Sequence, residues 1–348
     1  MEGKMKVAVM LGIGKMGYEE RDIPTPKPNE VLVKIEYVGI CGSDMHYYET
    51  GAIGNYVVEP PFVLGHEPGG TVVEVGSAVK NLKVGDRVAL EPGTTCGECE
   101  FCRSGKYNLC PDVVFWATPP VDGVFQEYAV HEATLCHKLP ENVSTMEGGL
   151  IEPLAIGFHA ANRGEAHIGQ SAVVFGSGCI GLVSMLALKA EGVSPIYVVD
   201  VMDNRLEKAK ELGADYVING MKEDAVAKIM ELTNGKGVDL AIETAGTEIT
   251  TNQAVHAVKK GSNIVLVGYG KTGKINVEMS LALDKEITFK TIFRSRHLFD
   301  TAIEAVRTGK VNLKGIVTDV FDFDDIQNAM DRACKEKANI VKAVIKIG

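Results

Sequence analysis

The chain has 348 residues, of which 45% are hydrophobic and 24% are charged, and its formal net charge is −10. These values are ordinary for a soluble globular protein with two domains, and the acidic surplus argues against nucleic acid as a partner. The longest uncharged apolar stretch, residues 179–188, is too short to cross a membrane, and residues 1–20 lack the apolar core of a signal peptide. We therefore expect a cytoplasmic protein without a membrane partner, in a reducing compartment that suits its eight cysteines.

The first half of the chain contains short valine-rich runs that are broken by Gly, Pro and Asp. Such runs are typical of the strands of a compact β-barrel or sandwich. Four examples lie at residues 31–38, 70–75, 87–90 and 125–130. A helix is predicted to begin near Met146 and to continue past Pro153.

From about residue 168 the pattern changes to alternating strands and helices. The predicted strands are 172–175, 196–200, 216–218, 239–242, 263–267 and 287–291, and the predicted helices are 180–190, 204–212, 223–233 and 250–259. Six strands with helical crossovers predict an α/β fold with a doubly wound parallel sheet. A last helix is predicted from about Phe293, followed by strands at 316–323 and 343–347 that would return to the β-rich domain. The expected domains are therefore 1–154 plus 293–348, and 155–292.

Four cysteines, Cys96, Cys99, Cys102 and Cys110, lie in one turn-rich stretch with the spacing C-x₂-C-x₂-C-x₇-C. The residues between them are small or polar, so the thiols have no apolar partners to pack with. Unpaired surface thiols and an iron–sulfur cluster are alternatives, but the spacing favours a closed tetrahedral site for structural zinc.

A glycine motif, Gly176, Gly178 and Gly181, follows an apolar strand and opens an apolar helix. In that context the motif predicts a dinucleotide site, because the glycines allow a tight turn and close approach of the backbone to a pyrophosphate. Asp200 ends the next strand, where a carboxylate accepts hydrogen bonds from ribose hydroxyls and repels a 2′-phosphate. We therefore expect NAD rather than NADP, with Arg205 beside the adenine; the alternative is that Arg205 recruits a phosphate.

A second group of metal-binding residue types lies in the β-rich half. Cys41, His66 and Glu67 together supply three zinc ligands and leave a fourth position for water or substrate. Glu152 is an acidic residue inside an apolar run, and a buried carboxylate needs a metal or a proton donor beside it.

These motifs resemble those of the zinc-dependent medium-chain dehydrogenases, and the resemblance covers the whole chain. Within that superfamily the chain is most similar to the sorbitol (polyol) dehydrogenases, which include xylitol dehydrogenases. The matching segments are 41–48 (CGSDMHYY), 53–58 (IGNYVV), 64–67 (LGHE), 117–123 (ATPPVDG) and 151–155 (IEPLA). Alcohol dehydrogenases of the superfamily typically have Cys where this chain has Glu152, which separates the polyol branch from them.

The resemblance implies a GroES-like catalytic domain beside a Rossmann domain, with one catalytic zinc, one structural zinc and NAD. Cys41, His66 and Glu67 would hold the catalytic zinc, and Glu152 would face the metal-bound water or bind directly. Ser43 and His46 match the proton-relay positions of the family. The positions that match polyol contacts are Tyr47, Tyr56, Phe115, Thr118, Glu152 and Arg294. The positions that match NAD contacts are Gly176, Gly178, Ile180, Gly181, Asp200, Arg205, Val267, Gly268, Tyr269, Ile292, Phe293 and Arg294.

The expected reaction is the NAD-dependent oxidation of a secondary hydroxyl of a sorbitol- or xylitol-like polyol to a ketose, by a homo-tetramer or a dimer. One departure bears on the substrate: after Arg294 the polyol enzymes usually have Tyr, whereas this chain has Ser295, then Arg296 and His297. Alternative substrates are a phosphorylated polyol, threonine, a butanediol or a simple secondary alcohol. An alternative of another class is a non-catalytic NAD-binding or lens-type structural protein on the same fold.

Overall fold

The computed structural model describes residues 2–270 and 273–348, which form two compact units. One unit comprises Met1–Glu152, Phe299–Arg307 and Val317–Gly348, and the other comprises Pro153–Leu298 and Thr308–Ile316. In these units, residues 153–154, 293–298 and 308–316 cluster with the second unit, whereas the expected domains assign them to the first.

The first unit is mostly β-structure, arranged around a seven-stranded sheet. Its strands are β1 (Lys4–Gly12), β2 (Lys15–Asp22), β3 (Glu30–Gly39), β4 (Ala52–Ile53), β5 (Tyr56–Val57), β6 (Glu67–Val75), β7 (Arg87–Leu90), β8 (Gly93–Thr94), β9 (Val114–Phe115), β10 (Tyr128–Glu132), β11 (Cys136–Lys138), β18 (Asp319–Asp322) and β19 (Ala343–Lys346). Its helices are α1 (Gly42–Thr50), α2 (Glu100–Arg103), α3 (Thr145–Gly149), α10 (Phe299–Arg307) and α11 (Ile326–Lys335). The sheet order is β11-β7-β6-β3-β19-β18, and β10 also pairs with β3.

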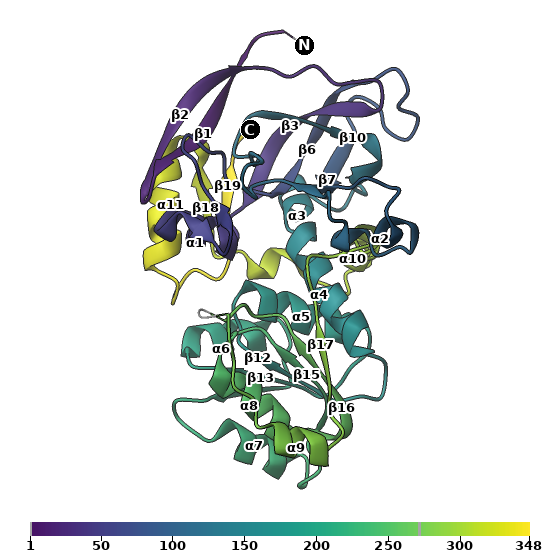
Figure 1. The fold of residues 1–348 in the computed structure, drawn as a ribbon, viewed down its shortest axis with the longest axis vertical. Coiled ribbons are helices and arrows are strands. Elements are labelled where there is room, and N and C mark those ends of the chain that lie inside the picture. Colours follow the sequence, from purple (N-terminus) through teal and green to yellow (C-terminus); the bar gives the residue numbers. More distant parts are fainter. Residues whose placement is uncertain (1, 271–272) are drawn as a thin grey trace. The chain divides into compact units, whose positions relative to one another are not determined.

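The closing strands return to this sheet, as the sequence predicts. β19 pairs antiparallel with β3, and β18 pairs parallel with β19. Figure 1 accordingly places the purple N-terminal strands and the yellow C-terminal segment in one unit. The helix α11 between the two closing strands was not predicted, although its apolar residues follow a helical spacing and are buried.

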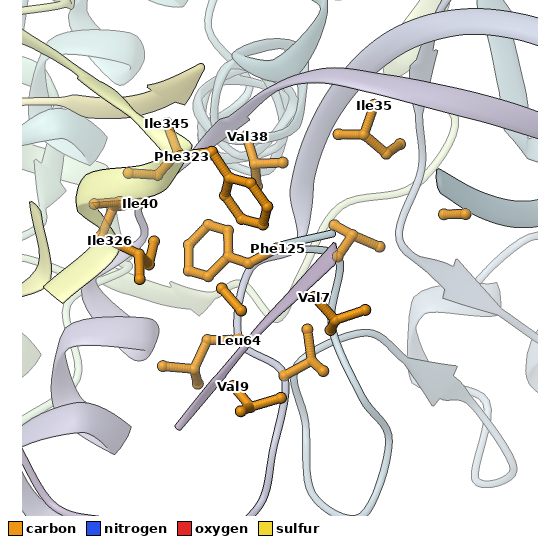
Figure 2. Packing of buried hydrophobic residues seen from close by; sticks show 14 of the residues in the cluster. Val7, Val9, Ile35, Val38, Ile40, Leu64, Phe125, Phe323, Ile326 and Ile345 are labelled. Atoms are coloured by element: carbon orange, nitrogen blue, oxygen red, sulfur yellow. The ribbon is translucent and has the colours of Figure 1, made fainter. Parts of the chain in front are cut away.

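The core of the first unit is built from the inward-facing residues of its strands and from the loops between them. Figure 2 shows Phe125 and Leu64, which lie outside the strands, packed among Val7, Val9 and Ile345. All five are fully buried, with no exposed surface. Burial of such side chains supplies most of the free energy that holds the sheet together.

The second unit contains one parallel sheet of order β14-β13-β12-β15-β16-β17. The strands are β12 (Ala172–Phe175), β13 (Ile196–Asp200), β14 (Tyr216–Asn219), β15 (Val238–Glu243), β16 (Val258–Leu266) and β17 (Thr288–Thr291). The helices are α5 (Cys179–Ala190), α6 (Asp203–Glu211), α7 (Ala225–Leu232), α8 (Glu248–Ala257) and α9 (Met279–Asp284), and α4 (Ile151–Gly164) enters from the first unit. The strand order reverses between β12 and β15, which confirms the doubly wound sheet and sets the position of its crevice.

Two predicted helices differ markedly from the structure. The single helix expected from Met146 is two helices, α3 and α4, because the helix is interrupted at Leu150, directly after two glycines. The helix expected from Phe293 begins only at Phe299: Arg294 and His297 both have a φ of 55°, a left-handed conformation that a helix cannot include. The short helix α9 was not predicted. Within residues 2–270 and 273–348, no helix is long and apolar enough to span a membrane.

A buried histidine in β10 gives a prediction about acid stability. His131 is 6% exposed, its Nε2–H donates to the carbonyl of Glu91 (2.7 Å), and its ring lies 4.2 Å from that of Trp116. Burial lowers the pKa of His131 to about 4, although the Glu91 carbonyl partly opposes this. The unfolded chain therefore binds a proton between about pH 6.5 and 4 that the folded chain does not, so the stability falls by about 3 kcal/mol over this range.

This prediction can be checked with urea unfolding at pH 7 and at pH 4.5. We expect His131→Asn to flatten the pH dependence of the unfolding free energy, whereas the exposed His167, replaced by Gln, should leave it unchanged. An equally steep pH dependence in His131→Asn and in the parent chain would contradict the assignment.

Candidate functional site

The three predicted catalytic-zinc ligands come together at the ends of two paired strands. β3 leads into Cys41, which caps the N-terminus of α1, and Glu67 is the first residue of β6, directly after His66. The register of the two strands places Gly39 opposite Glu67. One ligand atom from each of Cys41, His66 and Glu67 lies within 4.8 Å of the others. We refer to these residues as the three-ligand cluster.

The donor set of this cluster fits a zinc ion. A thiol, an imidazole and a carboxylate are the ligand types that zinc takes, and three protein ligands leave one position open for chemistry. His66 and Glu67 are 7% and 1% exposed. Such a concentration of buried polar atoms is costly unless a cation or hydrogen bonds compensate it.

Asp44 contacts two of the segments that carry the three-ligand cluster. It was not among the residues predicted from the sequence. Its carboxylate accepts hydrogen bonds from the backbone N–H groups of Cys41 (2.9 Å) and Gly65 (2.9 Å), and lies 3.7 Å from Nδ1 of His66. Burial favours a raised pKa for Asp44, but His66 and the two N–H groups outweigh it and lower the pKa. The signal that could have found Asp44 is its position in the first turn of α1, where an acidic side chain can bond back to the capping residue.

The neighbours of His66 shift its pKa in the opposite direction to that of Asp44. Burial favours a lowered pKa, but Cys41 and Asp44 outweigh it and raise the pKa of His66 well above its ordinary value. Asp44 therefore favours positive charge on the imidazole, although 3.7 Å is too long for a hydrogen bond and the buried Nδ1 of His66 has no hydrogen-bond partner among the described residues.

Lys342 is a second residue that the sequence analysis missed. Its ammonium group forms an ion pair with Oε2 of Glu67 and donates a hydrogen bond to the carbonyl of Ile40 (3.0 Å). The side chain is 2% exposed. A Cβ built on Gly39 would lie 2.0 Å from Oε2 of Glu67, so only glycine leaves room for this pair. Lys342 thus binds both segments that carry the ligands, although it lies 302 positions from Ile40.

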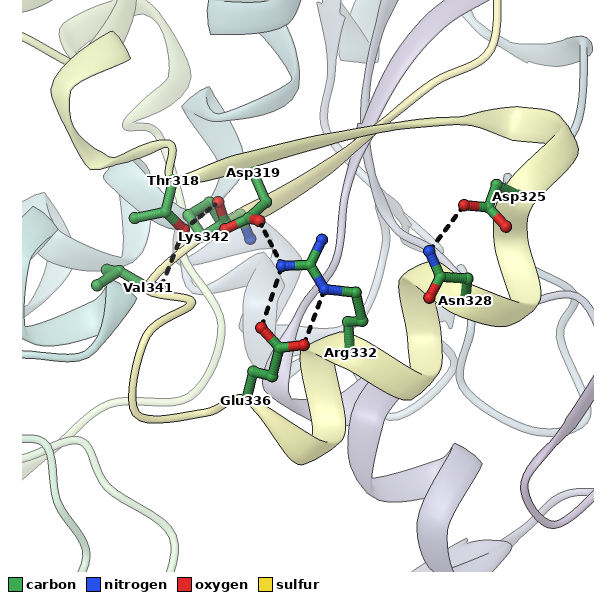
Figure 3. A network of polar contacts seen from close by, with 8 residues as sticks. All are labelled: Thr318, Asp319, Asp325, Asn328, Arg332, Glu336, Val341 and Lys342. Carbon is green, nitrogen blue, oxygen red and sulfur yellow. Dashed lines mark hydrogen bonds and ion pairs between the residues drawn. The ribbon is translucent and has the colours of Figure 1, made fainter.

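The loop that carries Lys342 is held by hydrogen bonds and ion pairs of residues in and next to β18 and α11 (Figure 3). The carbonyl of Lys342 accepts hydrogen bonds from the N–H of Thr318 (3.0 Å) and of Asp319 (3.4 Å). Arg332 on α11 contacts the carboxylates of both Asp319 (3.2 Å) and Glu336 (2.9 Å). The backbone at Lys342 is therefore fixed by the start of β18.

Glu152 lies in the first turn of α4 and is 7% exposed. Burial raises its pKa to about 7; the Glu67 carboxylate acts in the same direction, and His66 and Lys342 oppose it. Glu152 thus shares the electrostatic environment of the three-ligand cluster. It is not a member of the metal-binding group found among the described residues.

Of the relay and substrate candidates in the first unit, Phe115 has a ring contact with the three-ligand cluster, and Ser43, His46 and Tyr47 lie on the helix that Cys41 caps. Ser43 and His46 are three positions apart on α1 and so lie on one side of that helix. The Phe115 ring lies 5.7 Å from that of His66. The exposure of the other candidates varies: Tyr47 is 3% exposed, Tyr56 is 47% exposed and Thr118 is half-buried.

The four cysteines of the turn-rich stretch also come together, around α2. Sγ of Cys96 lies 3.9 Å from that of Cys102 and 3.5 Å from that of Cys110. Four thiolates around one zinc ion, at about 2.3 Å each, would stand about 3.8 Å apart, so the spacing fits. The N–H groups of Cys99 and Glu98 lower the pKa of Cys96 to about 7, which favours the thiolate that a metal needs.

In the second unit the glycine motif forms the turn between β12 and α5. Gly176 has a φ of 92°, and a Cβ built on Gly181 would lie 1.9 Å from the carbonyl oxygen of Gly176. These positions require glycine, as the sequence analysis expected of a turn that receives a pyrophosphate. Gly178 precedes α5, and Ile180 is in its first turn.

Asp200 ends β13 beside this turn. One carboxylate oxygen accepts hydrogen bonds from the N–H (2.6 Å) and hydroxyl (2.9 Å) of Ser177, and the other from the N–H groups of Val201 and Met202. Arg205 lies nearby, since a Cβ on Gly178 would be 3.9 Å from its Nη1. The structure therefore places the ribose-binding candidates at one end of the glycine turn.

The remaining cofactor candidates follow the carboxyl ends of β16 and β17. Val267, Gly268 and Tyr269 come directly after β16, and Tyr269 is 80% exposed. Ile292, Phe293 and Arg294 follow β17; the guanidinium of Arg294 lies over the Phe293 ring at 4.7 Å.

Comparison with known proteins identifies the family. Residues 27–141 match the alcohol dehydrogenase GroES-like domain, and residues 179–308 match the zinc-binding dehydrogenase domain. Sorbitol dehydrogenase of Bacillus subtilis is 43% identical over 341 residues, which cover 98% of this chain and 97% of that protein. The chain belongs to the zinc-dependent medium-chain dehydrogenases. Its similarity to sorbitol dehydrogenases places this dehydrogenase in the sorbitol branch.

Two further matches cover nearly the whole dehydrogenase. Human sorbitol dehydrogenase is 43% identical, over 93% of this chain and 91% of its own. The crystal structure of L-idonate 5-dehydrogenase from Escherichia coli aligns with a TM-score of 0.92 at 30% identity, over 100% of this chain and 99% of its own. The expected fold, a Rossmann sheet with a GroES-like domain, is thereby confirmed.

The four-cysteine site gives a prediction about stability. Cys99→Ser removes one of four thiolates, and we expect the purified protein to lose about one zinc per chain and about 3 kcal/mol or more of unfolding free energy. Metal analysis and urea unfolding measure the two quantities. Cys334→Ser is the matched control, because Cys334 lies outside both cysteine-containing clusters. An unchanged zinc content in Cys99→Ser would contradict the structural-zinc assignment.

Proposed function

We propose that this dehydrogenase uses NAD to oxidise a secondary hydroxyl of a polyol, of the sorbitol or xylitol type, to a ketose. The observation that carries the proposal is the three-ligand cluster with Glu152 buried in the same electrostatic environment. A second carboxylate at that place is what distinguishes the polyol branch from the alcohol dehydrogenases. The sorbitol dehydrogenases among its relatives support the same substrate class.

In this proposal Cys41, His66 and Glu67 hold the catalytic zinc, and Cys96, Cys99, Cys102 and Cys110 hold the structural zinc. When bound, catalytic zinc acts as a Lewis acid that lowers the pKa of a nearby hydroxyl, and NAD accepts the hydride. Asp44 and Lys342 keep the ligand side chains in place. Glu152, whose pKa is about 7, accepts or donates a hydrogen bond near neutral pH, as either a water or a polyol hydroxyl requires.

Ser43 and His46 provide the path for the hydroxyl proton. Ser43 is half-buried and His46 is exposed on the same side of α1, so a proton received at the serine hydroxyl can reach solvent through the imidazole. Tyr47, Tyr56, Phe115, Thr118 and Arg294 are the proposed polyol contacts, which orient the substrate for hydride transfer.

The second compact unit is the proposed NAD-binding domain, and the first is the proposed catalytic domain. Asp200 would accept hydrogen bonds from the ribose hydroxyls, with Arg205 beside the adenine. We further propose that the enzyme is cytoplasmic and forms a homo-tetramer, with a dimer as the alternative; its place in the sorbitol branch supports both statements.

A substrate panel tests the proposed reaction. Zinc-loaded enzyme, NAD and a set of candidates (sorbitol, xylitol, a phosphorylated polyol, threonine, 2,3-butanediol and a simple secondary alcohol) are followed by NADH absorbance. We expect turnover of a polyol and a lower kcat/KM for the others. Preference for threonine or butanediol would overturn the polyol assignment, and zinc-loaded protein that binds NADH but oxidises none of them would support the non-catalytic alternative.

The same assay tests the catalytic ligand set. Cys41→Ser should lower kcat/KM by more than about 100-fold, because a hydroxyl is a poor zinc ligand. NADH binding should persist, and metal analysis should show one zinc per chain rather than two. A fully active Cys41→Ser enzyme would contradict this ligand assignment.

Asp200 gives a prediction about cofactor choice. Asp200→Ala removes the proposed ribose contact and the negative charge that repels a 2′-phosphate, so kcat/KM for NAD should fall by about 100-fold while that for NADP falls less or rises. Ser177→Ala is the matched control, since it removes one hydrogen bond to the same carboxylate but keeps the charge. It should lower both values equally, and an unchanged NAD/NADP ratio in Asp200→Ala would count against the ribose contact.

A further inference from the structure

Glu243 is the last residue of β15, and its side chain has no exposed surface. β15 lies next to β12 at the point where the strand order reverses. In doubly wound sheets the ligand binds in the crevice beyond the carboxyl ends of the strands at this point. A buried charge at this place therefore invites an explanation in terms of the ligand.

The carboxylate of Glu243 organises the loop that follows it. Oε1 accepts hydrogen bonds from the N–H groups of Ala245 (2.9 Å) and Gly246 (2.9 Å) and from the hydroxyl of Thr250 (2.8 Å), and Oε2 accepts from Gly246 (3.1 Å). The backbone carbonyl of Glu243 accepts two more, from Val267 (2.8 Å) and Gly268 (3.1 Å). One residue thus binds both the loop after β15 and the loop after β16.

The two loops approach each other too closely for any side chain to stand between them. A Cβ on Gly268 would lie 2.2 Å from the nitrogen of Gly246, and Gly246 itself has a φ of 66°. On the other side, the hydroxyl of Thr244 contacts the carbonyls of Phe175 (2.8 Å) and Gly176 (3.2 Å). The loop after β15 therefore connects the glycine turn to the segment 267–269.

An ionised carboxylate suits this arrangement better than an amide. All the groups that face Glu243 are donors, and a carboxylate only accepts, whereas glutamine would present an NH₂ group to backbone N–H groups. Burial raises the pKa of Glu243, and the hydrogen bonds from Thr250, Gly246 and Ala245 oppose this.

We propose that Glu243 is a positioning residue for the dinucleotide, which holds the loops at 244–247 and 267–269 in the shape that receives it. Glu243 itself has no surface through which to touch the cofactor, so it acts through the backbone of these loops. The inference rests on the proposed function only in that the dinucleotide is NAD.

The test is a titration of NADH, followed by its fluorescence, into the zinc-loaded full-length protein at a temperature well below unfolding. Glu243→Gln has nearly the same shape, and we expect it to raise the Kd of NADH by about tenfold or more, because it loses hydrogen bonds to a charged acceptor. Zinc content should stay within twofold of the parent, because both proposed zinc sites belong to the first unit. Glu248→Gln is the matched control: it removes the same charge from an exposed position on α8, where it contacts Asn276, and should leave the Kd unchanged.

A Kd for NADH within twofold of the parent in Glu243→Gln, with or without a loss of thermal stability, would overturn the proposal, because the residue would then be structural only. Equal weakening in Glu248→Gln would also overturn it in favour of a general charge effect. If Glu243→Gln does not fold, Thr250→Val removes a single donor to the carboxylate and should raise the Kd in the same direction; no change there would contradict the proposal. Failure of the parent to bind NADH at all would instead refute the proposed cofactor.

Discussion

The ion pair between Lys342 and Glu67 is the interaction on which the candidate metal site depends. Glu67 is almost completely buried beside a thiol, an imidazole and the carboxylates of Asp44 and Glu152. Without a cation, several buried negative charges would each cost several kcal/mol. Lys342 compensates part of this charge in the absence of zinc, and its hydrogen bond to Ile40 fixes the strand end that leads into Cys41.

The same constraint bears on the C-terminal strands, which lie in the same sheet as the strands that lead to the ligands. The closing strands β18 and β19 complete the sheet that contains β3, and the loop before β19 brings Lys342 to the ligands. Arg332, Asp319 and Glu336 hold that loop from α11 and β18. The C-terminal segment is therefore part of the support of the candidate metal site. Its residues Ile326 and Ile345 pack into the core of the first unit, which holds this segment in place (Figure 2).

Local patterns in the sequence predicted much of this molecule. The strands β7, β12 and β13 have the predicted bounds, because each is a continuous apolar run closed by a polar or glycine residue. Both candidate metal clusters were predicted from their cysteines and histidine, and the structure brings the side chains of each set together. Asp44, Lys342 and Glu243 were missed because a single Asp, Lys or Glu is common, and its partners become visible only when distant segments meet. The predicted start of α10 was wrong because the left-handed conformation of Arg294 cannot be recognised from the amino-acid sequence.

Glu67 on the one hand, and Glu243 and Asp200 on the other, are buried carboxylates that are stabilised in two different ways, and the difference follows from what each must do. Glu67 is the proposed ligand, and its partner is one cationic side chain, Lys342, from a remote segment. Glu243 and Asp200 instead accept several N–H and hydroxyl hydrogen bonds from loop residues of their own unit, which fix the backbone around them. A cation would satisfy these carboxylates equally well, but it would not shape a loop. A carboxylate that accepts several backbone N–H groups fixes the conformation of the loop around it. A carboxylate that faces a lysine instead balances the charge of that lysine.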